Sequence, residues 1–283
     1  MLFKINVMFR MFRKTKQKIP FTRDRGYVIC IHNNLASVIH RLLIAVKGVK
    51  LIMVIDRSTD HENSPAQKIY KELRNRICLR VYKNGEILKE NEIAQEFSVS
   101  RTPVRESFQR LKLDGLIESK KKVGTVVKGI DDETIYELYE IRVNLLDYVA
   151  NESKEIYSEN DIQKMENLLE RVNKLSIQKD TAEYWKINDE LFSILISVIQ
   201  NKSLKQLIIS LFLQTAKNWA FLLPQIWDRS CEILKQEIER ELEFMKVGDK
   251  KGVIATWKCY VMASMQYCRS FAKELLVNQG TQE

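Results

Sequence analysis

Two arginines and two apolar residues interleave in a short stretch whose side chains could recognise a nucleic acid. Arg101 and Arg105 are four residues apart, and so are Val104 and Phe108. In a helix each pair shares a face, so the arginines would lie exposed opposite a buried apolar face. Arginine donates two parallel hydrogen bonds to the edge of guanine, and a helix fits the major groove of DNA. An amphipathic helix with a solvated basic face has the same spacing, so this stretch alone leaves both interpretations open.

The residues just before this stretch predict a helix-turn-helix. Ile93 and Phe97 lie four apart and would share one face of a preceding helix. Ser100 is a favourable cap for the second helix, because its hydroxyl can accept a hydrogen bond from an unpaired backbone N–H group.

A basic hairpin is predicted directly after these two helices. Residues 115–119 and 125–128 have the pattern of two short strands, and the turn between them holds three consecutive lysines and Gly124. Lysines at a hairpin tip can neutralise phosphates, and a glycine lets the backbone approach a groove closely. Residues 66–77 supply an upstream amphipathic helix. The order helix, helix-turn-helix and wing predicts a winged-helix DNA reader.

The stretch from residue 85 to residue 127 resembles the N-terminal domain of the GntR family of transcription regulators. The resemblance is carried by Gly-Glu-Ile-Leu-Lys-Glu-Asn-Glu-Ile-Ala from residue 85, Val-Ser-Arg-Thr-Pro-Val-Arg-Glu-Ser-Phe-Gln-Arg-Leu from residue 99, Asp-Gly-Leu-Ile from residue 114 and Gly-Thr-Val-Val from residue 124. It implies that Arg101 and Arg105 contact DNA in or near the bases. It also implies that Ser100 and Thr102 hold phosphate and that Gly124 enters the minor groove. The candidate DNA-binding residues are Asn91, Ser100, Arg101, Thr102, Arg105, Lys121, Lys122 and Gly124.

One of these positions departs from the family pattern. Many relatives carry arginine where this chain has Asn91. Asparagine has a shorter side chain and no charge, so one expected contact with the DNA is weakened or replaced.

The distribution of charge supports the same assignment better than the total does. The 283-residue chain carries a net charge of +9, but residues 1–52 alone hold 11 basic residues and one acid. Residues 65–130 hold 15 basic and 8 acidic residues, whereas residues 131–283 hold 19 and 25. The basic patch therefore belongs to the predicted winged helix, and the C-terminal part is acidic. Five scattered cysteines without a Cys-x-x-Cys pair argue for a reducing cytoplasm and against a disulfide framework or zinc finger.

The first 60 residues are expected to be a poorly defined basic extension. The apolar stretch 42–55 is interrupted by Lys47 and Lys50 and is shorter than the roughly 20 residues that span a membrane. It has no cleavage site of the secretory kind, so no membrane location is expected. Met53 leads directly into the winged helix and is a candidate start of translation. The expected division is an extension over 1–60, a winged-helix domain over 61–130, and a helical domain over 131–283.

The C-terminal part is predicted to be a bundle of about six helices. Apolar residues recur at helical spacing, and residues that cap or end helices separate the segments. The expected helices span 132–156, 159–175, 181–199, 203–222, 228–247 and 250–276. The predicted fold class is therefore mainly α, a winged helix-turn-helix followed by an all-helical bundle. This order resembles the FadR-like branch of the family, in which an FCD-type bundle surrounds a ligand cavity.

Metal binding, common in that branch, is not expected here. Its members hold a divalent metal with one aspartate and three histidines. The aspartate corresponds to Asp189, but Ser193, Ile238 and Tyr260 stand at the expected histidine positions. These side chains cannot form a tight transition-metal site, so neither a metal nor a cofactor is predicted.

The cavity is expected to persist and to bind a small organic acid. Arg142 could hold a carboxylate through two parallel hydrogen bonds, and the candidate effector-binding residues are Arg142, Asp189, Ser193 and Tyr260. The competing interpretation is a packed bundle in which Arg142 pairs with Asp147 or Asp189. The leading hypothesis is a cytoplasmic, ligand-responsive repressor that binds an inverted-repeat operator as a homodimer.

Two other hypotheses compete with this one. An effector-independent DNA-binding protein would use the bundle only for dimerisation or for contact with another protein. An enzyme fused to a winged helix would need a longer α/β half and a catalytic set of side chains, neither of which the sequence offers.

Overall fold

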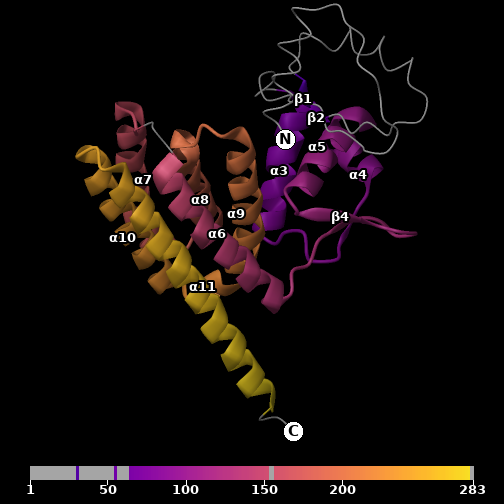
Figure 1. Ribbon diagram of the computed structural model, residues 1–283. Helices are drawn as coiled ribbons and strands as arrows, with labels where there is room; N and C mark the ends of the chain where they lie inside the picture. The colour runs from indigo at the N-terminus through magenta and orange to yellow at the C-terminus, as the bar shows by residue number, and fades with distance from the viewer. Residues whose placement is uncertain (1–29, 32–53, 56–63, 153–155, 281–283) are drawn as a thin grey trace, which may run out of the picture. The chain divides into compact units, whose positions relative to one another are not determined.

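The computed structural model describes residues 30–31, 54–55, 64–152 and 156–280, drawn in colour in Figure 1. The chain divides into two compact units, residues 1–62 and 63–283. In the first unit the described strands β1 (Cys30–Ile31) and β2 (Val54–Ile55) pair in parallel. Met53, and with it the proposed start of translation, lies outside the described residues. All further elements belong to the second unit.

The N-terminal part of the second unit is a winged helix-turn-helix. Its elements are the helices α3 (Pro65–Cys78), α4 (Glu90–Glu96) and α5 (Arg101–Leu113) and the strands β3 (Ile87–Leu88), β4 (Ile117–Lys120) and β5 (Gly124–Val127). The strands form one antiparallel sheet in the order β3-β5-β4. The helix-turn-helix and the wing are thus present where their sequence patterns predict them.

Buried apolar residues from all three helices and the wing hold this fold together. Leu73 and Ile77 of α3, Phe108 and Leu111 of α5, and Val127 of β5 are almost fully buried. Ser64 caps α3 by accepting a hydrogen bond from the backbone N–H of Gln67. These contacts fix α5 against α3 and leave the opposite face of α5 to solvent.

The cap expected for α5 is only half right. Ser100 does occupy the N-cap position, with extended backbone geometry, but its side chain makes no capping hydrogen bond. Its hydroxyl stays exposed at the start of the helix. This serine is therefore free of the capping role and accessible from outside.

The C-terminal part is the predicted helical bundle. It consists of α6 (Asp132–Glu152), α7 (Glu159–Gln178), α8 (Thr181–Leu195), α9 (Lys202–Leu222), α10 (Trp227–Lys246) and α11 (Lys250–Gly280), with 3-10 turns η2 (Ile196–Val198) and η3 (Leu223–Gln225) after α8 and α9. The expected helices begin within about one residue of the observed ones. Caps coded in the sequence account for this agreement: Ser158 and Asp161 form a capping box at α7, and Asp180 and Asn201 cap α8 and α9.

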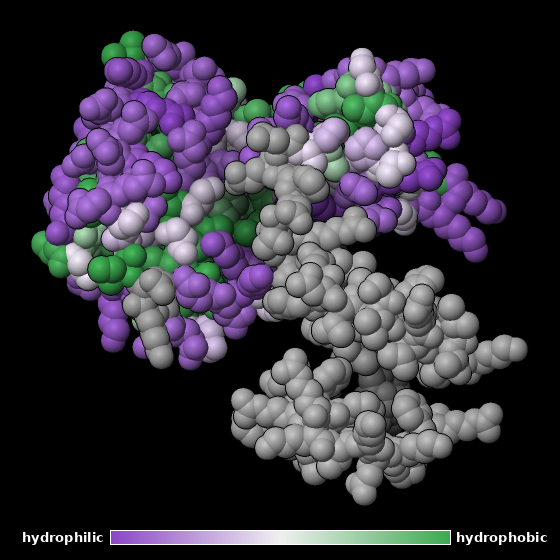
Figure 2. All heavy atoms as spheres, turned by 90° about the horizontal axis from the view of Figure 1, so that it is seen from above, coloured by the Kyte–Doolittle hydropathy of each residue, from purple (hydrophilic) through white to green (hydrophobic). Residues whose placement is uncertain are grey.

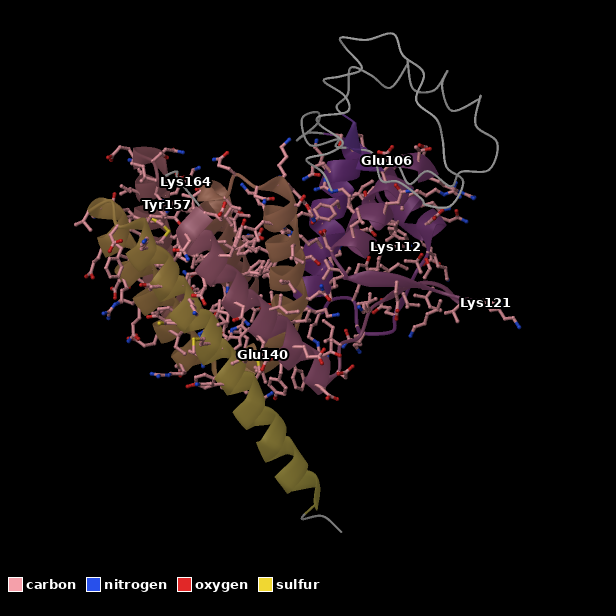
Figure 3. The ribbon with its side chains drawn as sticks, viewed as in Figure 1. Glu106, Lys112, Lys121, Glu140, Tyr157 and Lys164 are labelled. Atoms are coloured by element: carbon pink, nitrogen blue, oxygen red, sulfur yellow. The ribbon has the colours of Figure 1, made fainter. Side chains whose placement is uncertain are left out.

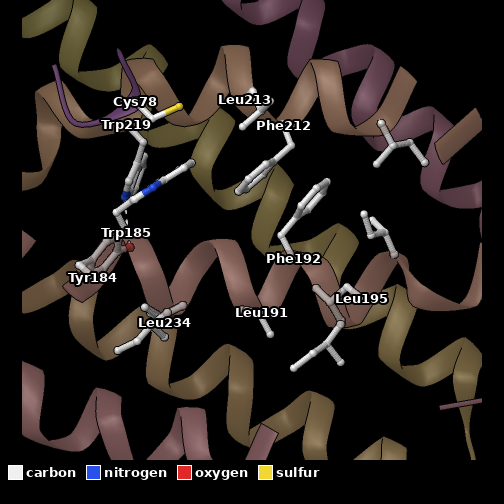
Figure 4. Packing of buried hydrophobic residues seen from close by; sticks show 14 of the residues in the cluster. Cys78, Tyr184, Trp185, Leu191, Phe192, Leu195, Phe212, Leu213, Trp219 and Leu234 are labelled. Carbon is white, nitrogen blue, oxygen red and sulfur yellow. Dashed lines mark hydrogen bonds between the residues drawn. The ribbon is translucent and has the colours of Figure 1, made fainter. Parts of the chain in front are cut away.

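The core of the bundle is aromatic. Phe192 of α8 and Phe212 of α9 stack with ring centroids 3.8 Å apart, and Trp257 of α11 meets Phe192 edge-on. Figure 4 shows Trp185, Trp219 and Tyr184 gathered at one end of this packing and the two phenylalanines facing each other further along. The indole N–H of Trp219 donates to the hydroxyl of Tyr184. Rings of this size fill the space between helices and define where a cavity can remain.

The surface of the described residues is mainly hydrophilic. Purple residues cover most of it in Figure 2, and green ones form separate patches. One segment, Lys202–Gln225, is long and apolar enough to cross a membrane, but half of its apolar window is buried inside the protein. It contains α9, which packs against α6 on one side and α3 on the other. The apolar character of α9 is thus explained by its central place in the fold.

Candidate DNA-binding face and bundle cavity

The candidate DNA-binding residues all lie on the solvent side of the winged helix. Arg101, Thr102 and Arg105 are exposed along α5, on the side away from its buried residues. Lys112 at the end of α5 and Lys121 at the tip of the wing are labelled in Figure 3, where Lys121 extends away from the rest of the protein. Helix and wing therefore present basic side chains that a nucleic acid could reach.

Arg105 is held by a carboxylate that the sequence analysis did not single out. Its Nε atom donates to Oε2 of Glu90, the first residue of α4, at 2.8 Å. Arg105 remains 61% exposed and Glu90 35% exposed. Because only Nε faces Glu90, the two terminal nitrogens of the guanidinium are left to donate to a base edge or a phosphate. The pair orients Arg105 and leaves most of its side chain exposed.

The turn between α4 and α5 forms a shallow hollow. Asn91, Ser100 and Arg101 line it, which brings three of the candidate residues together. Gln95 and Ser98 also line it and were missed by the sequence analysis, although both lie on the exposed side of the same motif. Ser98 has a φ of 53°, the left-handed geometry of a tight turn between two helices.

The wing tip has the geometry that its glycine predicts. Lys120 pairs with Gly124 at the end of β4 and β5, so the exposed residues Lys121 and Lys122 form the turn. Gly124 has a φ of 117°, which side chains with a Cβ atom rarely adopt. Its ideal Cβ position meets no heavy atom within 4 Å, so the glycine is required by the backbone and the space around it is open.

A cavity of about 90 Å³ lies inside the bundle. Arg142 of α6 and Tyr260 of α11 line it, as the sequence analysis predicts. Asp189 and Ser193 do not line it, and this part of the prediction is wrong. Asn188 and Phe192 of α8, which are also four residues apart, line the cavity in their place. The sequence analysis therefore placed the cavity-facing side of α8 one residue too far along the chain. Ser193 is exposed and its hydroxyl donates to the carbonyl of Asp189.

Glu237 lines the cavity and was missed. It precedes Ile238, which the sequence analysis considered instead and which is fully buried in the core. The same one-residue shift explains both errors. Burial raises the pKa of Glu237 to about 8, although the positive charge of Arg142 opposes the shift. Within the described residues no three His, Cys, Asp or Glu side chains are grouped so as to hold a metal ion.

Arg142 forms no ion pair with a carboxylate among the residues that the structure describes. Its Nη1 donates to the hydroxyl of Thr215 at 2.6 Å, and its guanidinium lies over the rings of Tyr139 and Phe212. Burial lowers its pKa, and the nearby Tyr139 and Glu237 oppose that shift. The alternative of a structural Arg142 ion pair is therefore also wrong, because Asp147 binds Lys258 and Asp189 binds Arg74.

The wall of the cavity is connected to the winged helix through α8. Nη2 of Arg74, on α3, lies 2.5 Å from Oδ2 of Asp189, and the indole N–H of Trp185 donates to the side chain of Asn75. Trp185 lines the cavity, and so does Cys78 from the end of α3. One turn of α8 thus contacts the cavity on one side and the DNA-binding part on the other.

A second connection runs through the end of α5. Asp114 is buried, accepts a hydrogen bond from the hydroxyl of Tyr70 at 2.6 Å, and accepts another from Gln206 of α9 at 2.9 Å. Gly115, with a φ of 74°, follows directly, and a Cβ atom there would lie 2.6 Å from the side chain of Gln214. Both residues connect the end of α5 closely to α9.

An exposed recognition helix with a basic wing, attached to a helical bundle with an internal cavity, defines a DNA-binding transcription regulator with a sensor-type domain. The chain matches two protein families, described as "Bacterial regulatory proteins, gntR family" over residues 65–127 and "FCD domain" over residues 137–256. It belongs to the GntR family and carries an FCD domain. This family consists of bacterial regulatory proteins.

Relatives with recorded descriptions agree. The chain is 36% identical over 129 residues to the gluconate operon transcriptional repressor of Bacillus subtilis, an alignment that covers 46% of this chain and 52% of the repressor. It thus spans about half the length of that relative. It is 25% identical over 211 residues to the uncharacterized HTH-type transcriptional regulator YdhC of Bacillus subtilis, covering 74% of this chain and 91% of YdhC.

Solved structures share the fold. The Escherichia coli protein McbR/YncC superposes with a TM-score of 0.61 at 19% identity, covering 74% of this chain and 99% of that protein. A GntR transcriptional regulator from Rhodococcus sp. RHA1 superposes with a TM-score of 0.57 at 18% identity, covering 72% and 97%.

Proposed function

We propose that this regulator is a cytoplasmic repressor that binds a short inverted-repeat operator as a homodimer and leaves it when a small organic acid occupies the bundle cavity. The observation that carries the proposal is the contact of one helix, α8, with both the cavity and the DNA-binding part. Trp185 and Asn188 line the cavity, and Asp189 next to them binds Arg74 of α3. A ligand that shifts α8 would act on α3 directly, which is the differential contact that allosteric control requires.

The assignment of residues to DNA contacts follows from exposure and chemistry. Arg101 and Arg105 would reach base edges in the major groove, while Ser100, Thr102 and Asn91 would hold phosphates beside them. Lys121 and Lys122 would neutralise phosphates and Gly124 would approach the minor groove. A single recognition helix reads too few base pairs for specificity in a genome, which favours a homodimer on two half-sites.

The assignment of the cavity rests on Arg142. Its partly buried guanidinium carries a positive charge and donates a hydrogen bond to the neutral hydroxyl of Thr215. Glu237 acts on this charge without forming an ion pair among the described residues, so a ligand carboxylate would supply the direct anionic partner. The repressor sense of the proposal is supported by the name of the gluconate operon repressor among its relatives.

Selection of DNA sites from a random pool by the full chain tests the proposal. We expect an inverted repeat whose half-site preference is relaxed by Arg105→Ala, at a cost of about 1–3 kcal/mol of discrimination. Lys164→Ala, a change of an exposed basic residue on α7, is the matched control and should leave the preference unchanged. If Arg105→Ala and the control select the same sites with equal affinity, Arg105 does not read a base.

The selected operator then tests the response to ligand. Titration of the protein–operator complex with a panel of small carboxylic acids should release the DNA for at least one acid, and Arg142→Gln should abolish that release. If no acid acts and Arg142→Gln binds the operator normally, the bundle serves only dimerisation or contact with another protein.

A further inference from the structure

The bundle contains two glutamates, one partly and one fully buried, that neither the fold nor the proposed DNA contacts explain. Glu237 and Glu241 lie one turn apart on the same face of α10. Glu237 lines the cavity. Glu241 is fully buried, and neither of its carboxylate oxygens has a hydrogen-bond partner among the described residues. A buried polar group without a partner is costly, so its retention calls for an explanation.

Arg142 of α6 and Glu237 of α10 both line the cavity, so a cation and an ionisable carboxyl group face the same space. Arg142 gives one donor to Thr215, which leaves further N–H groups of its guanidinium. Glu237 opposes the fall in the pKa of Arg142 that burial causes, and Arg142 opposes the rise in the pKa of Glu237. Tyr260, which also lines the cavity, feels the charges of both Glu237 and Glu241. Glu241 follows Glu237 by one turn of α10, and the charges of the two carboxyl groups act on each other.

We propose that the ligand of this cavity carries both a carboxylate and an amino group, with the carboxylate on Arg142 and the ammonium on Glu237, backed by Glu241. This inference rests on the proposed function and names the class of effector. A simple organic acid would bring a third carboxyl group to two acids and one arginine. A simple amine would leave Arg142 without an anion. A zwitterion supplies an anion to Arg142, and its ammonium stabilises the ionised form of Glu237, whose raised pKa otherwise favours the protonated form.

The size and the walls of the cavity restrict the ligand further. Its volume of about 90 Å³ is several times the roughly 10–15 Å³ that one water requires in the same measure. It has room for an amino acid of moderate size and not for a peptide. Trp185, Trp219 and Phe192 line the remaining wall, and Figure 4 shows the two tryptophans close together near Cys78. These rings favour an apolar side chain on the ligand.

Thermal unfolding of the full chain with matched trios of compounds tests the proposal. Each trio contains an amino acid, the acid that lacks its amino group and the amine that lacks its carboxylate. Leucine, 4-methylpentanoate and 3-methylbutylamine are one example. Alanine, valine, leucine and phenylalanine trios cover the accessible sizes, and calcium, magnesium and zinc chlorides are tested alone. We expect at least one amino acid to stabilise the protein at concentrations at which its two analogues do not, with an affinity at least about tenfold higher.

Two variants on α10 locate the amino group. Glu237→Gln should lower the affinity for that amino acid at least about tenfold while leaving the weak binding of the acid analogue unchanged or improved. Glu243→Gln, an exposed change on the same helix, should alter neither. Arg142→Gln should remove the binding of both the amino acid and its acid analogue.

Several results would overturn the assignment. The first is equal affinity for an amino acid and its acid analogue, and the second is an unchanged preference of Glu237→Gln for the amino acid over that analogue. The third is stabilisation by a metal ion that Glu237→Gln abolishes. The fourth is the lack of any thermal shift with every compound of the panel. Operator binding is measured separately on the same preparations. A regulator that binds its operator and responds to a simple acid keeps the proposed function and loses only this ligand class.

Discussion

The ion pair between Arg74 and Asp189 should contribute to the free energy of unfolding far more than an ordinary surface pair. Its side chains are only 16% and 22% exposed, and their atoms approach to 2.5 Å. Arg74 also donates to Asn75 and lies over the ring of Trp185. Hydrogen bonds to charged groups contribute about 1.5–3 kcal/mol, and a partner left without its counter-charge adds a desolvation cost.

A double-mutant cycle isolates this interaction. Asp189→Asn and Arg74→Gln should each destabilise the protein by about 2 kcal/mol, and the double variant should be less destabilised than the sum by about 1–2 kcal/mol. The unit spans residues 63–283. At about 2.1 cal/mol/K per residue, the entropy of unfolding of a unit of this size converts 2 kcal/mol into a fall in Tm of about 4 °C. Thermal and urea unfolding measure both quantities.

The matched control is the exposed pair of Lys246 and Glu166. Its atoms are also close, at 2.7 Å, but the side chains are 52% and 48% exposed. The corresponding cycle should give a coupling of no more than about 0.5 kcal/mol. Equal coupling energies in the two cycles, or additive effects of Asp189→Asn and Arg74→Gln, would refute the view that this pair fastens α3 to the bundle.

Three further predictions concern the wing, the cavity and the junction. Lys121→Ala and Lys122→Ala should each weaken operator binding equally across sequences and reduce the slope of log affinity against log salt by about 1, as titrations at several salt concentrations would reveal; an unchanged slope argues against phosphate contact. The pKa of Glu237 is raised to about 8. Its protonated form therefore favours the fold, and this contribution is complete below pH 4.5 and declines as the pH rises to 8. Relative to Glu237→Gln, the wild type should lose at least about 1 kcal/mol of stability across that range; parallel curves for the two proteins would contradict this. Gly115→Ala should lower the free energy of unfolding by about 1–3 kcal/mol, because its φ of 74° is strained for alanine and the new methyl would lie 2.6 Å from Gln214. The control is Gly129→Ala, where a Cβ atom meets only Asn84 at 3.9 Å. Equal stability of the two variants in denaturation experiments would show that the junction adjusts to the added methyl.

Local patterns were sufficient to predict the helices and the two strands of the wing, but strand β3 was not predicted. Asp180 and Asn201 cap the helices that follow them, and their side-chain chemistry acts within three residues. The wing followed in the same way from a basic turn that needs Gly124 at positive φ. These signals depend on neighbours in the sequence, so they are legible without the folded structure.

The cavity could not be predicted to the same accuracy, because it depends on the rotation of helices about their axes. A shift of one residue turns a side chain by about 100°. This shift separates Asn188 from Asp189 and Glu237 from Ile238, and it exchanges a cavity-lining residue for one that faces elsewhere. Neither the Arg74–Asp189 pair nor the Glu90–Arg105 pair could be inferred, since their partners lie 115 and 15 residues apart and meet only through packing.

The contribution of Cys78 and Leu79 to the cavity wall limits how freely the two halves of this protein can be exchanged. Both residues lie at the end of α3, the first helix of the winged part. A chimera that joins this bundle to a foreign winged helix would replace part of the surface that encloses the ligand. Such a chimera would therefore inherit an altered specificity for ligand as well as a new operator. Exchange by recombination should succeed best where the incoming helix keeps the Arg74-Asn75 and Cys78-Leu79 positions.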